Sequence, residues 1–467
     1  MKYISTRGQA PAVSFEEVVL TGLAPDGGLY IPASLPAITV QQLQAWRQLS
    51  YAELAFEIIR LFVDGAIPDD KLRVMINESY AGFSNSDVAP LHHLDNNNWV
   101  LELYCGPTLA FKDFALQLLG RLLDFFLEKR QQYVAILGAT SGDTGSAAIE
   151  GCKHCKYVEL FILHPHNRVS EVQRRQMTTV SGDNINNLAI EGNFDDCQQI
   201  VKQAFSDQSF LPAGYQLVAV NSINWARIMA QIVYYFYAAL KFQDKFPIPT
   251  PISFSVPTGN FGDIYAGYLA KKMGLPIRQL VIATNSNDIL HRFISSNRYF
   301  KNTLQASLSP SMDIMVSSNF ERFLYDLFQG DTQRVTSFVT GLSSEVQQVT
   351  PQEWEQARAQ FSSYGVDDAS TVATIKSVFK NSEFLLDPHT ATGVKAAQVC
   401  NTDPAVVMII LGTAHPVKFA AAIEQAGLTV PALPPHMADL LTKKELYTVL
   451  GNSLQAVQKH ILANLKK

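Results

Sequence analysis

The fold class is decided by YVAILGATSGDTG, residues 133–145. Residues 133–137 form a short apolar run of the kind that lies inside a sheet, with both faces covered. A loop rich in glycine and hydroxyl side chains follows, and a helix is expected to begin near Ser146. A buried strand, a short loop and a helix in this order are one part of a βαβ unit.

The same succession of strand, loop and helix repeats along much of the chain after about residue 100. Such alternation favours an α/β fold with a mostly parallel sheet, because right-handed crossover connections place helices on both faces. Further strands are predicted at residues 158–163, 188–190, 217–220, 252–256, 280–284 and 406–410. The helices between them are predicted at residues 171–180, 196–205, 225–242 and 263–273.

The length of 467 residues predicts more than one domain. Residues 1–90 carry helical periodicity but no obvious chemical constellation, and we expect them to form a separate, mainly helical domain. Residues 91–245 and 246–467 are expected to form two further lobes. Within the second lobe, residues 286–385 are expected to be a less regular, mostly helical insertion, and residues 443–465 one or two terminal helices.

Composition excludes some classes of protein. Hydrophobic residues make up 47% of the chain and charged residues 17%, which is incompatible with general intrinsic disorder. The net charge of −5 argues against binding nucleic acid through bulk positive charge. The longest apolar run, residues 232–240, is far shorter than the roughly 20 residues that span a bilayer. We therefore interpret it as a buried helix and expect no membrane partner.

The chain contains five cysteines, an odd number at sparse spacing that is typical of a reducing compartment. With no targeting segment evident, a cytoplasmic protein is predicted. Cys152 and Cys155 form a CxxC pair, but a zinc site would need a second pair, so we predict no metal site. Two thiols near the end of a helix are favoured over a redox pair.

Two loops that follow predicted strands offer sites for anions, since ligands of open α/β sheets bind at the carboxyl ends of strands. Residues 140–145 place backbone N–H groups and hydroxyls at a helix start, although Ser, Thr and Asp also favour that position simply as helix caps. Residues 257–263 lack the lysine of a P-loop, and they fit either a nest for a single phosphate or an ordinary tight turn.

Lys112 lies in an aromatic setting, between Phe111 and Phe114. A buried lysine has a lowered pKa and can act as a nucleophile and as a base. The alternative is a surface lysine that pairs with Asp113 at a helix start. Lys112, a phosphate nest and a second anion loop together fit pyridoxal phosphate, which needs a lysine for its aldehyde, a nest for its phosphate and a partner for its ring nitrogen.

In these motifs the chain resembles the threonine synthase family, in the branch with a distinct N-terminal domain. The similarity covers nearly the whole length, and the motifs stand in the family's order, which is far more specific than any of them alone. The matching stretches are residues 3–8, 22–30, 106–114, 140–145, 221–227, 257–263, 387–390 and 411–416. The resemblance implies a fold-type-II pyridoxal-phosphate enzyme, similar to the tryptophan synthase β subunit, with two parallel-sheet lobes and a mainly helical N-terminal domain.

The resemblance also implies which residues hold the cofactor. Lys112 would bond to the cofactor aldehyde and act as the catalytic base. Thr413 would meet the pyridine nitrogen, where a neutral hydroxyl leaves that nitrogen largely unprotonated. The loop around the cofactor phosphate would consist of Gly259, Asn260, Phe261, Gly262 and Asp263.

For the substrate, the resemblance implies two groups of residues. The amino-acid end would be held by Ser141, Asp143 and Thr144. Asn224 and Arg227 stand at positions i and i+3, so they are expected to share a helix face, and Arg227 would grip the substrate phosphate. A solvated helix charge is the alternative interpretation of Arg227.

The implied reaction is a carbon–oxygen lyase reaction that converts O-phospho-L-homoserine and water to L-threonine and phosphate, the last step of threonine biosynthesis. The alternatives are a phospho-lyase that releases phosphate without forming threonine, and a β-replacement enzyme or dehydratase on the same fold. The intact Lys112 disfavours a non-catalytic protein.

Further expectations concern the oligomeric state, two histidines and a tyrosine-rich run. A monomer is expected. His389 and His415 stay open between acid–base chemistry and buried hydrogen bonding, and the tyrosine-rich run at residues 234–237 is expected in the core.

Overall fold

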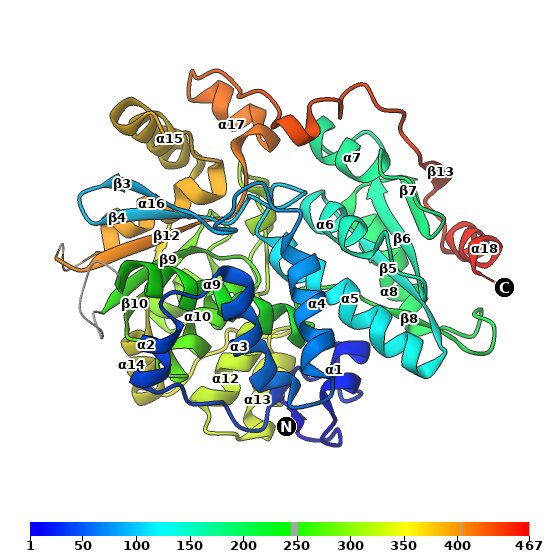
Figure 1. Cartoon of the computed structure of the whole chain (residues 1–467), viewed down its shortest axis with the longest axis horizontal. Helices are drawn as coiled ribbons and strands as arrows, with labels where there is room; N and C mark the ends of the chain where they lie inside the picture. Colours follow the sequence, from blue (N-terminus) through cyan, green and yellow to red (C-terminus); the bar gives the residue numbers. More distant parts are fainter. Residues whose placement is uncertain (244–250, 402, 404, 467) are drawn as a thin grey trace.

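The computed structural model describes residues 1–243, 251–401, 403 and 405–466. Two sheets with surrounding helices lie side by side, and the N-terminal helices, blue in Figure 1, lie in front of the region between them. The predicted fold class, α/β with parallel-sheet lobes and a helical N-terminal region, is confirmed. The predicted boundary between residues 245 and 246 lies outside the described residues.

The first sheet is five-stranded and parallel. Its strands are β5 (Tyr133–Ala139), β6 (Val158–Pro165), β7 (Ile185–Glu191), β8 (Tyr215–Val218) and β13 (Thr448–Gly451), in the order β13-β7-β6-β5-β8. The helices between its strands are α6 (Asp143–Cys152), α7 (Glu171–Thr178) and α8 (Phe194–Ser206). Every residue of β6 is buried, because helices cover both faces of a parallel sheet.

The second sheet is six-stranded, and only its β3–β4 pair is antiparallel. Its strands are β3 (Leu91–Asp95), β4 (Asn98–Glu102), β9 (Ile252–Pro257), β10 (Ile277–Thr284), β11 (Phe361–Gly365) and β12 (Val407–Gly412), in the order β11-β10-β9-β12-β4-β3. The helices of this half are α10 (Gly262–Lys272), α11 (Ile289–Ser296), α12 (Phe320–Leu327), α13 (Thr332–Gly341), α14 (Pro351–Gln360), α15 (Asp368–Ser382), α16 (Pro388–Cys400) and α17 (Ala420–Gln425).

The two sheets exchange strands along the chain. The β3–β4 hairpin precedes the strands of the first sheet in sequence, yet β4 pairs with β12 of the second sheet. Conversely, β13 follows the strands of the second sheet, yet it pairs with β7 of the first. Helix α18 (Leu454–Asn464) then packs against α8. Residues 91–245 and 246–467 therefore each contribute strands to both sheets.

The N-terminal region combines helices with a small antiparallel sheet. Its elements are β1 (Tyr3–Ser5), α1 (Phe15–Thr21), β2 (Tyr30–Pro32), α2 (Val40–Trp46), α3 (Tyr51–Val63) and α4 (Asp69–Tyr80). Capping boxes begin α2 at Thr39 and α3 at Ser50. Helix α3 packs on α9 (Trp225–Gln243) and α4 on α5 (Lys112–Arg130), so this region shares one apolar core with the rest of the chain.

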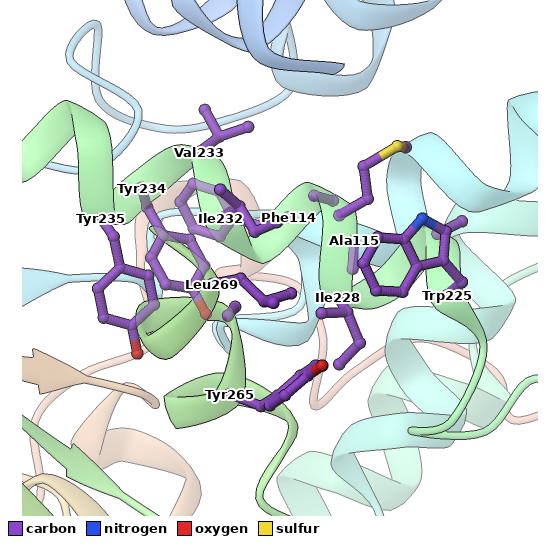
Figure 2. Close-up of a cluster of buried hydrophobic side chains, with 14 of the residues drawn as sticks. Phe114, Ala115, Trp225, Ile228, Ile232, Val233, Tyr234, Tyr235, Tyr265 and Leu269 are labelled. Carbon is purple, nitrogen blue, oxygen red and sulfur yellow. The ribbon is translucent and has the colours of Figure 1, made fainter. Parts of the chain in front are cut away.

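Helix α9 contributes much of the shared core, and Figure 2 shows its contacts with α5 and α10. The labelled apolar side chains include Phe114, Trp225, Ile228, Ile232 and Leu269. Tyr234 and Tyr235 are fully buried, as predicted. Their hydroxyls donate to Asp263 Oδ1 at 2.5 and 3.0 Å, so the core also fixes the start of α10. In the part of the chain that the structure describes, no helix is long and apolar enough to cross a bilayer.

Helix α6 begins at Asp143, earlier than the predicted start near Ser146. The hydroxyl oxygen of Thr140 accepts hydrogen bonds from the amides of Gly142 and Gly145, at 3.0 and 2.9 Å. This side chain satisfies amides that a helix start leaves unpaired. Asp143 and Thr144 therefore belong to the first helical turn rather than to the loop before it.

The prediction of helices alone for residues 443–465 is wrong. Residues 448–451 form β13, because their β-branched and apolar side chains pair with the edge strand β7. Helix α18 begins only after Ser453, whose hydroxyl accepts a hydrogen bond from the amide of Ala456. Strand β11, within residues 286–385, likewise has no counterpart among the predicted strands.

Candidate active site

The carboxyl ends of β5, β9 and β12 face a cavity of about 320 Å³. Loops from both sheets line this cavity, as expected for a ligand site in an α/β fold. Its lining includes Lys112, Ser141, Asp143, Thr144, Arg227, Gly259, Asn260, Phe261, Gly262, Asp263 and Thr413. The structure thus brings together every predicted site residue except Asn224.

Lys112 is the first residue of α5, and its side chain is buried against the cavity with 9% exposure. Its Nζ donates to Asp143 Oδ2 at 3.4 Å and lies 4.9 Å from the centre of the Phe111 ring. The alternative pairing with Asp113 does not occur, because that carboxylate accepts from the amide and hydroxyl of Thr108, both at 2.8 Å. Burial lowers the pKa of Lys112. The Asp143 carboxylate raises this pKa, and the cations Lys418 and Arg227 lower it further.

Asp143 is held by groups from four other segments. Besides Lys112, its carboxylate accepts hydrogen bonds from Gln173 at 2.8 Å and Ser311 at 3.2 Å, and Lys418 Nζ lies 2.6 Å from Oδ1. Burial opposes ionisation of this carboxyl, but the two ammonium groups outweigh it and hold the pKa of Asp143 well below its usual range. Asp143 is therefore a fixed carboxylate at the wall of the cavity.

The loop before α10 presents backbone amides to the cavity. Phe261 has a φ of +65° and buries its ring against Phe320 and Phe361, with ring centres 5.3 and 5.5 Å away. Carbonyl oxygens of the loop are occupied, since Ser317 donates to Gly259 O at 2.6 Å and Asn319 to Asn260 O at 3.1 Å. Amides in the first turn of a helix lack intrahelical partners and favour an anion.

The side chain of Asp263 is fixed by hydrogen bonds from the core. Its Oδ1 accepts from Tyr234 and Tyr235, and burial raises the pKa of Asp263 to about 6 against the effect of these hydroxyls. A carboxyl that faces the core leaves the backbone of residue 263 as its contribution to an anion site.

Arg227 and Asn224 do not share the cavity. Arg227 is 4% exposed, which excludes a solvated charge, and burial lowers its pKa to about 10. Among the described residues its Nε has no hydrogen-bond partner. Asn224 precedes the first residue of α9, so the helical i,i+3 geometry does not hold, and its Nδ2 donates to Val19 O at 3.0 Å. Asn224 thus contacts α1 instead of the cavity.

Two motifs near the carboxyl end of the second sheet meet at the cavity wall. Thr413 is 5% exposed there, and its amide donates to Thr390 Oγ1 at 3.2 Å. His389 also lines the cavity; its Nδ1 is 2.8 Å from Asp387 Oδ1, and its Nε2 accepts from the amide of Ser311 at 3.2 Å. Both ring nitrogens of His389 are thus engaged.

His415 lies apart from the cavity and makes a hydrogen bond within its own loop. It lies outside the set of cavity-lining residues, and its Nδ1 accepts a hydrogen bond from the amide of Val417 at 3.2 Å. Burial lowers the pKa of His415 to about 4. This histidine is therefore neutral at physiological pH and contributes buried hydrogen bonding.

Three family models match successive parts of the chain, the last two with an overlap. The model "Threonine synthase N terminus" matches residues 2–80, "Pyridoxal-phosphate dependent enzyme" matches residues 86–412, and "Threonine synthase, C-terminal" matches residues 390–461. The chain belongs to the threonine synthase family. The resemblance predicted from the motifs is confirmed, and with it the assignment to pyridoxal-phosphate-dependent enzymes.

Threonine synthases from other organisms are similar to this chain over nearly its whole length. That of Pseudomonas aeruginosa is 60% identical, with 98% of this chain and 97% of that protein covered. The crystal structure of pyridoxal-phosphate-bound threonine synthase from Brucella melitensis matches with a TM-score of 0.97 at 46% identity, covering 100% of both chains. The yeast threonine synthase structure matches with a TM-score of 0.94 at 40% identity, covering 99% and 98% of the two chains.

The cavity of this threonine synthase family member fits pyridoxal phosphate. Lys112 offers a buried amine, the start of α10 offers amides for a phosphate, and Thr413 offers a neutral hydroxyl. The Arg227 guanidinium, which has an unpartnered Nε among the described residues, can take a second anion. The donor set thus matches a lysine-linked cofactor and a phosphorylated substrate.

Sequence reasoning missed several residues that hold the site together. Gln173, Ser311 and Lys418 all contact Asp143. Gln173 lies in a stretch for which only a helix is predicted, Lys418 follows the last matching motif, and Ser311 lies in the irregular part of the chain. Their contacts follow from tertiary packing, and no local signal in the sequence marks them.

In the described part of the chain, no group of three or more His, Cys, Asp or Glu side chains could hold a metal ion.

Proposed function

We propose that this chain is a threonine synthase that converts O-phospho-L-homoserine and water to L-threonine and phosphate. The observation that carries the proposal is one cavity that joins the buried Lys112 to the amides at the start of α10 and to Arg227. A lysine-linked phosphorylated cofactor and a phosphorylated substrate need these three features together. Membership of the threonine synthase family supports the choice among enzymes on this fold.

Lys112 is proposed as the residue that moves protons. When bound, pyridoxal phosphate supplies an electron sink that stabilises negative charge on the substrate carbon atoms. The Lys112 amine, freed when the substrate amine takes its place on the cofactor, would accept the α proton and then a β proton. Burial lowers the pKa of Lys112, which suits a group that must alternate between amine and ammonium.

The other residues are proposed to orient the substrate. Arg227 would bind the phosphate that leaves the γ carbon, since its guanidinium is buried and faces the cavity. Ser141 and Thr144 would bind the substrate carboxylate at the start of α6, while Asp143 would face the amino group. Thr413 would meet the cofactor ring nitrogen as a neutral partner. Asn224 would support α9 through α1 without touching substrate.

The proposal is tested by incubating the purified full-length protein with O-phospho-L-homoserine and measuring phosphate and threonine in parallel. Equal amounts of both products are expected. Phosphate with 2-oxobutyrate instead of threonine would identify the phospho-lyase. Activity with O-acetylserine and sulfide, and none with phosphohomoserine, would identify a β-replacement enzyme. Lys112→Ala should abolish both turnover and the absorption band of the bound cofactor.

We further propose a cytoplasmic monomer that acts on small molecules. All five cysteines are free, which supports a reducing compartment. Residues 1–90, 91–245 and 246–467 are proposed as successive units of the chain, although the two sheets exchange strands across the last two of them. Gel filtration with light scattering tests the oligomeric state.

A further inference from the structure

Lys418 is a buried cation beside the proposed catalytic lysine. It ends the short 3-10 helix Pro416–Lys418, and its side chain has 0% exposure. Its Nζ lies 2.6 Å from Asp143 Oδ1 and donates to the carbonyl oxygen of Thr108 at 2.8 Å. Lys418 is absent from the cavity lining, so it reaches the cavity only through Asp143.

Asp143 stands between two ammonium groups. Lys112 approaches one carboxylate oxygen at 3.4 Å and Lys418 the other at 2.6 Å. Lys112 must lose its charge to react with an aldehyde or to accept a proton. Without a second cation, that loss would leave a buried carboxylate with no opposite charge, which is costly in a low-dielectric interior. With Lys418 in place, the carboxylate stays paired in both states of Lys112.

We propose that Lys418 is a positioning residue, a counter-cation that keeps Asp143 paired so that Lys112 can gain and lose its proton freely. This inference rests on the proposed role of Lys112 as the lysine that bonds to pyridoxal phosphate. The shorter of the two contacts belongs to Lys418, so Asp143 is engaged chiefly by the cation that does not react.

Other charged groups around Lys112 come from several elements. Arg227 from α9 adds positive charge, Asp263 from α10 adds a carboxyl, and Asp113 of α5 faces Thr108 instead. His415 lies beside Lys418 and is neutral. Burial lowers the pKa of Lys112, Asp143 opposes this, and Lys418 and Arg227 lower it further. Removing Lys418 should therefore leave Asp143 to hold the Lys112 proton more tightly.

The test measures how fast the full-length chain, freed of cofactor, recombines with added pyridoxal phosphate at a series of pH values. In this step the nitrogen lone pair of neutral Lys112 bonds to the aldehyde carbon, and the aldehyde oxygen leaves as water with the two amine protons. Only the neutral amine reacts, so the rate rises with pH until Lys112 is deprotonated. The midpoint of this rise reports the protonation of Lys112, independently of turnover.

Lys418→Met should move this midpoint upward by about 1 pH unit or more, and slow recombination about tenfold per unit below it. The matched control is Gln173→Leu, which removes a neutral hydrogen bond to the same carboxylate oxygen and should leave the midpoint close to that of the unmodified chain. A Lys418→Met midpoint equal to that of the unmodified chain would overturn the proposal, since a purely structural role changes amplitude and stability but not the midpoint.

The variant Asp143→Asn with Lys418→Met removes the buried pair together and should bring the midpoint back towards that of the unmodified chain. This double variant also covers the case in which Lys418→Met alone does not fold. Asp143→Asn alone should then have a lower midpoint than the double variant, and the reverse order would refute the proposal. If the chain recombines with pyridoxal phosphate and shows the expected midpoints but produces no threonine, the proposed function is wrong and this inference about Lys418 still holds.

Discussion

The amide of Ser311 donates to His389 Nε2 at 3.2 Å, although 78 positions separate the two residues. The Ser311 hydroxyl donates in turn to Asp143 Oδ2 at 3.2 Å. Asp143 belongs to α6, one of the helices that connect the strands of the first sheet. Ser311 thus connects α16, which carries His389, to α6, which carries Asp143. The segment around Ser311 forms a wall of the cavity and is held by a contact to each side.

Replacing His389 tests this connection. His389→Phe keeps a ring but removes the acceptor for the Ser311 amide and the partner of Asp387. Buried polar groups that lose a partner cost about 1–3 kcal/mol each, so stability to urea should fall by that amount and kcat/KM by about tenfold. His93→Phe, at an exposed position of strand β3, is the control and should change neither quantity. Full activity in His389→Phe would show that the contact has no functional effect.

Arg322 should be essential for stability. It is 0% exposed, donates to Tyr30 O at 3.0 Å and Ile223 O at 2.6 Å, and bonds to Asn319, which holds the loop before α10. Arg322→Met leaves these buried acceptors unpaired, so the free energy of unfolding should fall by about 3 kcal/mol or more.

Urea denaturation measures this loss, and spectroscopic titration with pyridoxal phosphate should show weaker cofactor binding as well. Arg334→Met, which breaks the exposed ion pair with Glu353, is the matched control and should cost less than about 1 kcal/mol. Equal losses in the two arginine variants would contradict the role given to Arg322.

The loop before α10 leaves little room for a larger residue at position 259. A Cβ on Gly259 would lie 3.1 Å from Ser311 O and 3.1 Å from Ile314 Cγ1. Gly259→Ala should therefore push the two loops apart and weaken cofactor binding about tenfold, since overpacking costs about 1–3 kcal/mol. Gly82→Ala, where a Cβ meets nothing within 4 Å, is the comparison. Unchanged cofactor affinity in Gly259→Ala would show that the loops tolerate the displacement.

Asp263 should give stability a distinct pH dependence. Burial raises its pKa to about 6, above the value of about 3.9 in an unfolded chain. The folded chain therefore binds this proton more tightly, so the contribution of Asp263 is full below about pH 4 and is lost as pH rises to about 6. Asp263→Asn should remove this step of about 3 kcal/mol from the free energy of unfolding.

Urea denaturation of the cofactor-free chain between pH 4 and pH 7 measures the Asp263 step. Tyr234→Phe, which removes one hydroxyl donor to the same carboxylate, should extend the step to higher pH. Parallel pH profiles for the unmodified chain and Asp263→Asn would rule out the assignment.

Local pattern was sufficient to predict the α/β class, most strands of the two sheets and the loops that line the cavity, but not the order of the strands. The loops at 140–145 and 257–263 directly follow predicted strands, and strand ends in parallel sheets converge. Lys418 and Ser311 were out of reach, because their roles depend on contacts with Asp143 over long sequence separations. No periodicity encodes such contacts.

The strand β13 carried too weak a signal for prediction from its own residues. It is four residues long, largely exposed, and extended only because β7 offers it an edge. The expectation that Asn224 and Arg227 share a helix face was wrong because their spacing was taken as helical, whereas the helix begins one residue after Asn224.

The pairing of β13 with β7 has a consequence for biosynthesis. Thr448 pairs with Leu188, so β7 leaves the ribosome long before its partner does. Until residue 451 has been synthesised, the nascent chain carries an open sheet edge with unpaired N–H and C=O groups, which can associate with other chains. The first lobe therefore completes its folding only at the end of translation, and protection of that edge by a chaperone would matter most during this interval.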